Sequence, residues 1–118
     1  MTRLGMTPGT IVVVSLHEPR EKYWGVLVQM MLAGIVVRGM DVNAFADWLE
    51  QEAHGAEKAL SPSTVFFPMG RVERVEVDEA AGPIPGLADA FRERTGKDPA
   101  RALGFVPPTR RRSRPPRR

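Results

Sequence analysis

The sequence contains no cysteine, which excludes a disulfide framework and a thiolate metal site. No stretch approaches the roughly 20 apolar residues that a membrane-spanning helix needs. The opening residues, MTRLGMTPG, lack the apolar segment of a secretory signal peptide. We therefore expect a cytoplasmic protein without membrane contact. The 118 residues favour one domain, and 42% hydrophobic residues suffice for a modest core.

Signatures of catalysis and metal binding are also missing. His17 begins a zincin-like pattern, but Glu21 stands where the second histidine is required, and His54 is the other histidine of the chain. Residues 95–98 are similar to the end of a phosphate loop, yet Phe91 occupies the position of its first glycine. We expect no enzymatic activity, no metal, no cofactor and no small-molecule substrate, and we interpret the glutamates as solvated surface groups.

Positive charge is concentrated at the end of the chain. The net charge is +3, but residues 106–118 hold six arginines and no acid, which leaves −3 for residues 1–105. These arginines are Arg110, Arg111, Arg112, Arg114, Arg117 and Arg118. We predict a single domain over 1–105 and a disordered Arg/Pro-rich tail over 106–118. The tail is a candidate for contacts with RNA or DNA phosphates, for an inert solubilising extension, or for polyproline docking to a partner.

Apolar and β-branched runs predict five short strands, at residues 10–16, 23–31, 35–38, 64–67 and 72–77. Gly34 is expected to supply the positive φ of a hairpin turn after the second strand. Gly25 indicates a bend or a close approach of another backbone. In the last strand valines alternate with Arg74 and Glu76, as in a sheet with one wet face.

A helix is expected between the third and fourth strands. Phe45, Trp48, Leu49 and Glu52 share one stripe at helical spacing, Asp41 or Asn43 can cap its start, and Gly55 can end it. A second helix over 87–95 and one turn after Asp98-Pro99 form a C-terminal helical flank. The predicted fold is mainly β with helical additions: a strongly bent five-stranded antiparallel small barrel or roll.

This pattern resembles the Sm-like small β-barrel family. Gly25-Val26-Leu27 matches the Gly-x-Leu of the first family motif, and residues 64–77 are similar to the second, a strand, a glycine-containing turn and a strand. The resemblance covers roughly residues 10–78. It implies a ring in which the fourth strand of one subunit pairs with the fifth strand of the next. The corresponding interface candidates are Val65, Phe67, Val75 and Val77.

The residues with which the family binds RNA do not carry over. Met31, Gly34 and Ile35 stand where the resemblance would place the Asp and Asn between the second and third strands. The bulky helix between the third and fourth strands is a further departure, because the family usually has a variable loop there.

Several aromatic side chains are alternative RNA contacts, because bases stack on exposed rings. These are Phe45, Trp48, Phe66, Phe67 and Phe91. Core packing is the favoured interpretation, with Trp48 buried in its own subunit or against a neighbour. We expect a non-enzymatic, homo-oligomeric binding or scaffold protein of Sm-like type, with possible RNA contact through the tail. The alternative is a protein–protein assembly module without a nucleic-acid role.

Overall fold

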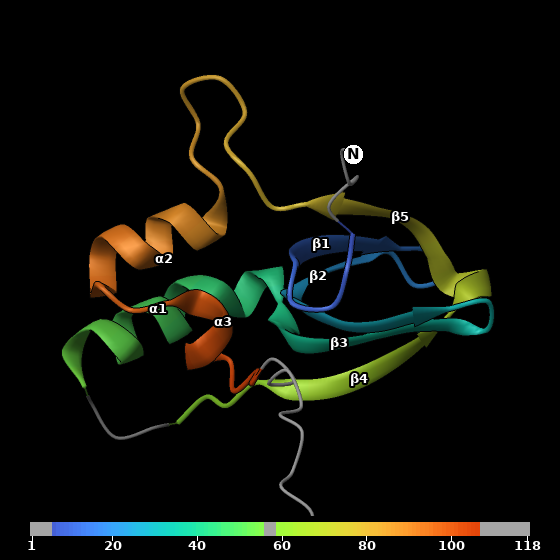
Figure 1. Ribbon diagram of the computed structural model, residues 1–118, viewed down its shortest axis with the longest axis horizontal. Coiled ribbons are helices and arrows are strands. Elements are labelled where there is room, and N and C mark those ends of the chain that lie inside the picture. The colour runs from blue at the N-terminus through green and yellow to red at the C-terminus, as the bar shows by residue number, and fades with distance from the viewer. Residues whose placement is uncertain (1–5, 56–58, 107–118) are drawn as a thin grey trace, which may run out of the picture.

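A computed structural model describes residues 6–55 and 59–106 of the chain. Five strands form one antiparallel sheet in the order β4-β3-β2-β1-β5 (Figure 1). The elements in chain order are β1 (Ile11–Leu16), β2 (Glu21–Met31), β3 (Gly34–Asp41), the 3-10 turn η1 (Val42–Ala44), α1 (Phe45–His54), β4 (Ser63–Pro68), the 3-10 turn η2 (Met69–Arg71), β5 (Val72–Val77), α2 (Leu87–Thr95) and α3 (Pro99–Ala102).

The predicted five-stranded antiparallel sheet, its helix between the third and fourth strands and its C-terminal helical flank are confirmed. Closure of the sheet into a barrel is not found. The strands β4 and β5 are the two edges, on opposite sides of the sheet in Figure 1, and η2 connects them. The result is an open, mixed α/β fold. None of the helices in the described part is long and apolar enough to span a bilayer.

The inner face of the sheet is mostly aliphatic. Its buried cluster consists of Val12, Val14, Leu16, Tyr23, Leu27, Ile35, Val37 and Phe67. The Tyr23 hydroxyl donates to the carbonyl oxygens of Gly39 (3.0 Å) and Ser63 (3.4 Å), and its ring meets Phe67 edge-on. This side chain therefore joins β2, β3 and β4 through one polar atom placed beside an apolar cluster.

The outer face has an aromatic cluster at the end of the sheet that the helices cover. Its cluster consists of Trp24, Val26, Met40, Phe45, Trp48, Phe91 and Leu103. Trp48 of α1 stacks on Phe91 of α2 with ring centroids 4.8 Å apart, and Trp24 of β2 meets Phe45 edge-on at the same centroid separation. The stripe predicted for α1 is confirmed, and Trp48 is buried within its own chain.

Asp78, directly after β5, fixes the start of α2. Its carboxylate accepts the indole N–H of Trp24 at 2.9 Å and the backbone N–H groups of Leu87 and Ala88 at 2.9 and 2.6 Å. The first N–H groups of a helix have no partner within the helix. A single carboxylate thus ties the sheet to a helix that begins nine residues later in the sequence.

Gly25 of β2 and Gly39 of β3 are paired directly opposite each other in the sheet. A Cβ on Gly25 would lie 2.3 Å from the Arg38 carbonyl oxygen, and one on Gly39 would lie 2.0 Å from that of Trp24. The predicted close approach at Gly25 is therefore confirmed. The third strand is longer than predicted, because Gly39 continues the pairing with β2 beyond the predicted end at Arg38.

The prediction that Gly34 supplies a positive φ for the hairpin turn is wrong. Gly34 does not have positive φ. A side chain is excluded there because a Cβ would lie 2.2 Å from the Phe67 carbonyl oxygen of β4. A bulge between Leu27 and Gln29 also shifts the register of β2. Beyond the bulge Met30 is exposed.

Candidate functional site

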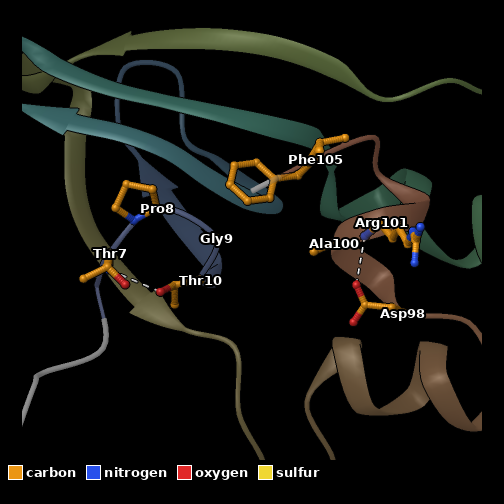
Figure 2. A pocket seen from close by; sticks show the side chains of 9 residues that line it. Thr7, Pro8, Gly9, Thr10, Asp98, Ala100, Arg101 and Phe105 are labelled. Carbon is orange, nitrogen blue, oxygen red and sulfur yellow. Dashed lines mark hydrogen bonds between the residues drawn. The ribbon is translucent and has the colours of Figure 1, made fainter. Parts of the chain in front are cut away.

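A hollow among the described residues lies between the N-terminal segment and the C-terminal flank (Figure 2). Its volume is about 650 Å³, and it is lined by Thr7, Pro8, Gly9, Thr10, Asp98, Ala100, Arg101, Phe105 and Val106. The Gly9 N–H donates to the Leu27 carbonyl oxygen at 2.8 Å, which holds this segment to the middle of β2. Gly9 has φ +100°, and a Cβ on it would lie 3.4 Å from the Phe105 ring.

Asp98 and Thr10, two of the polar side chains of this hollow, accept hydrogen bonds from the chain itself. Asp98 caps α3 by accepting the Arg101 N–H at 3.0 Å, and the Thr10 hydroxyl accepts the Thr7 N–H at 3.2 Å (dashed lines in Figure 2). Thr, Pro, Ala and Phe side chains supply the rest of the lining. A mostly apolar hollow with few polar groups is suited to binding. The lining contains no pair of a nucleophile and a base that would indicate catalysis.

The four predicted interface residues lie on the two edge strands. Val65 and Phe67 belong to β4 and turn towards the inner cluster, where Phe67 is buried and Val65 is half-buried. Val75 packs against the same cluster from β5, and Val77 is half-buried opposite Val12 of β1. The structure therefore places all four beside the open seam of the sheet, on strands with one neighbour each.

The aromatic side chains considered for base stacking are mostly core residues. Phe45, Trp48, Phe67 and Phe91 are each at most 6% exposed, so no base can stack on them in this structure. Phe66 differs, because it is 47% exposed on β4. The prediction of core packing is confirmed for four of the five.

Two buried ionisable groups are accounted for by structural contacts. Burial raises the pKa of the Tyr23 hydroxyl, Asp41 acts in the same direction, and Arg38 opposes them. Glu52 is buried on α1, and the Lys97 ammonium donates to its carboxylate at 3.2 Å and to its backbone carbonyl at 3.1 Å. Both arrangements join separate elements of the fold.

No group of three or more potential metal ligands is found within residues 6–55 and 59–106. His17 lies in the turn after β1, near Glu18. His54 ends α1, where its ring is 3.7 Å from the Glu50 carboxylate. The two histidines therefore belong to different parts of the fold.

The six tail arginines, the predicted nucleic-acid contacts, lie outside the described residues.

Sequence reasoning missed the hollow beside Phe105, because its walls are more than 80 residues apart and no local pattern links them. It also missed the role of Asp78. An aspartate shortly before a helix is a capping signal, but the eight intervening residues hid it.

Comparison with known protein families, curated proteins and solved structures finds no match for this chain. The resemblance to the Sm-like family therefore stays a prediction, and the arguments about function rest on the geometry of the chain itself.

Proposed function

We propose that this protein is a non-enzymatic, homo-oligomeric scaffold or binding module of Sm-like type, assembled by pairing β4 of one copy with β5 of the next. The observation that carries the proposal is the strand order, which leaves these two strands as open edges of one sheet. This order also fits the Sm-like resemblance, which implies ring contacts between the fourth and fifth strands.

The β4 edge supports pairing through its composition. Natural proteins protect exposed edges with charged residues, proline or bulges. The sequence of β4, STVFFP, contains no charge, and its single proline stands at the last position. Phe66, near the middle of this edge, is the exposed member of its hydrophobic run. An unprotected edge of this kind favours a partner strand.

The β5 edge differs from β4, because it carries Glu73, Arg74 and Glu76 and a bulge, but its length and its valines match a β4 partner. It has the same length as β4, six residues, and it carries Val72, Val75 and Val77, each half-buried. Pairing would cover these valines further and satisfy backbone groups that have no neighbouring strand. A second copy of the chain supplies this edge without any other protein.

The symmetry of the assembly follows from the use of two different edges. An interface between unlike surfaces is heterologous, and it closes into a ring when the rotation between copies permits. We expect a closed ring because a filament would leave one β4 edge and one β5 edge unprotected at its ends. The RNA contact predicted for the tail is not part of this argument.

Native mass spectrometry of the full chain tests the proposal. The wild type should be a discrete oligomer, and Phe66→Lys should shift it to monomer because a charge is placed on the β4 edge. Leu32→Lys is the matched control, since Leu32 is 99% exposed in the β2–β3 turn and its replacement should leave the oligomer intact. A monomeric wild type, or a Phe66→Lys oligomer of unchanged size, would contradict the pairing. The same spectra report any bound nucleic acid.

A further inference from the structure

A smaller hollow is lined by residues at the C-terminal end of β1 and by its neighbours. This end of β1 points away from the helices in Figure 1. Ser15 is on the outer face there, because its neighbours Val14 and Leu16 belong to the inner cluster and side chains alternate along a strand. Its partners across the sheet are Lys22 on β2 and Arg74 on β5. Directly opposed residues share a face, with Cβ atoms about 4.5–5.5 Å apart. The serine is therefore flanked by two cationic side chains.

The Ser15 hydroxyl is buried without a partner. The residue is 7% exposed, and its Oγ has no hydrogen bond to any of the described residues. Nearly all buried side-chain polar atoms in proteins have a partner, and an unsatisfied one costs free energy. The Lys22 and Arg74 side chains on either side are exposed, so they can move to admit a ligand to this hydroxyl.

The hollow has a volume of about 210 Å³, which corresponds to roughly seven water molecules at 30 Å³ each. Arg20, Glu21 and Glu73 complete its polar lining. Glu73 is the extra residue of a bulge, since Leu16 is paired with Val72 and Ser15 with Arg74. Bulges are frequent beside binding sites because they redirect side chains and interrupt the ladder.

Positive charge dominates once the ion pairs are considered. The Glu21 carboxylate is bound by Arg71 at 3.4 Å, and Arg74 pairs with Glu76 at the same distance on an exposed surface. No ion pair of Arg20 or Lys22 is found within the described ranges. Of the two acids in the lining, Glu21 has an ion-pair partner, whereas no ion pair of Glu73 is found among the described residues. Glu73 is therefore the acid that would repel a bound anion.

We propose that this hollow, the Ser15 site, binds a phosphate group, either as free inorganic phosphate or as the terminal phosphate of a monoester. A phosphate oxygen accepts the Ser15 O–H, and Lys22, Arg20 and Arg74 neutralise its charge. Hydrogen bonds between charged donors or acceptors are stronger than neutral ones, and Arg and Lys are the usual phosphate ligands. The site is independent of the proposed assembly, although it borders the β5 edge.

Titration of the full chain with inorganic phosphate, followed by residue-resolved NMR at constant ionic strength, tests this site. Saturable shifts are expected at the backbone amides of Ser15, Arg20, Lys22 and Arg74. Ser15→Ala should weaken binding about tenfold, the effect expected of one hydrogen bond to a charged group. Shifts confined to residues 106–118, or an affinity unchanged by Ser15→Ala, would overturn the proposal.

Further variants separate a ligand role from a structural one. Lys22→Gln should weaken binding and Glu73→Gln should strengthen it, whereas Arg92→Gln on α2, which removes a cation paired with Asp89, is the control and should change nothing. Without phosphate, Ser15→Ala should melt no lower than the wild type, because its hydroxyl has no partner to lose. A lower melting temperature in phosphate-free buffer would identify a structural hydroxyl and contradict the proposal.

Parallel titrations with a nucleoside 5′-monophosphate and with the corresponding nucleoside identify the source of the phosphate. Tighter binding of the monophosphate than of inorganic phosphate indicates an ester, and equal binding indicates the phosphate alone. Equal binding of the phosphate-free nucleoside would overturn the site.

Discussion

The outer and inner faces of the sheet differ in what covers them. The outer face is aromatic where α1, α2 and α3 of the same chain cover it, and its far end carries Ser15, Lys22 and Arg74. The inner face is aliphatic and ends at β4 and β5, two strands with one neighbour each. The chain therefore buries one aromatic cluster under its own helices, whereas the other cluster ends at two open strand edges. Stability should depend mainly on the outer face, and assembly on the edges of the inner one.

Replacing Trp24 with alanine should have the largest effect on stability. Its indole is fully buried against Phe45 and Trp48, and its N–H is bound by Asp78. We expect a loss of about 3–5 kcal/mol in the free energy of unfolding, measured by urea denaturation. Val65→Ala on the inner rim should cost about 1 kcal/mol, because this valine is half-buried. Similar losses for both variants would remove the proposed difference between the faces.

Asp78→Ala should have the next largest effect, because it separates α2 from the sheet. Two helical N–H groups and the Trp24 indole lose their shared acceptor. The expected cost is about 2–3 kcal/mol, from a lost cap and a buried unsatisfied donor. Asp78→Asn retains one acceptor oxygen, so its free energy of unfolding should lie between those of the wild type and Asp78→Ala. Denaturation followed by far-ultraviolet circular dichroism measures this, and an alanine variant within 0.5 kcal/mol of wild type would contradict the assigned role.

Tyr23→Phe should have the smallest effect, about 1 kcal/mol near neutral pH, because the inner face loses one hydrogen bond to Gly39. Its pH dependence is more informative. The folded chain raises the pKa of Tyr23 above 10.0, so the contribution of the neutral hydroxyl is complete below pH 10 and declines as pH rises through the folded pKa. Wild type should therefore lose more stability than Tyr23→Phe between pH 9 and 11. Parallel pH curves for the two proteins would exclude this coupling.

Local patterns in the sequence predict most of the secondary structure. The stripe of α1 and the alternation of β5 are short-range periodicities, and both are found where they were expected. The failures involve contacts between distant segments. The backbone of β4 excludes a side chain at Gly34, and the bulge after Leu27 changes the register of β2. Neither neighbour can be identified from the residues on either side in the sequence.

The candidate sites were less predictable than the fold. Val65, Phe67, Val75 and Val77 were proposed as interface residues on the Sm-like resemblance, and the strand order places their strands at the two edges of the sheet. Ser15 carried no signal, because a serine within a valine-rich strand gives no indication that Lys22 and Arg74 lie on either side. That arrangement depends on the register of three strands, and the register is a property of the whole sheet.

The facing glycines of β2 and β3 have a consequence for recognising related proteins. Gly25 and Gly39 each occupy space that a methyl group would take from the opposite backbone, so replacing either one forces the strands apart. A homologue with the same pairing of these two strands must have glycine at both positions, whatever the neighbouring residues are. We therefore expect any homologue with this strand pairing to have two glycines on successive strands, separated by thirteen residues where the hairpin has the same length.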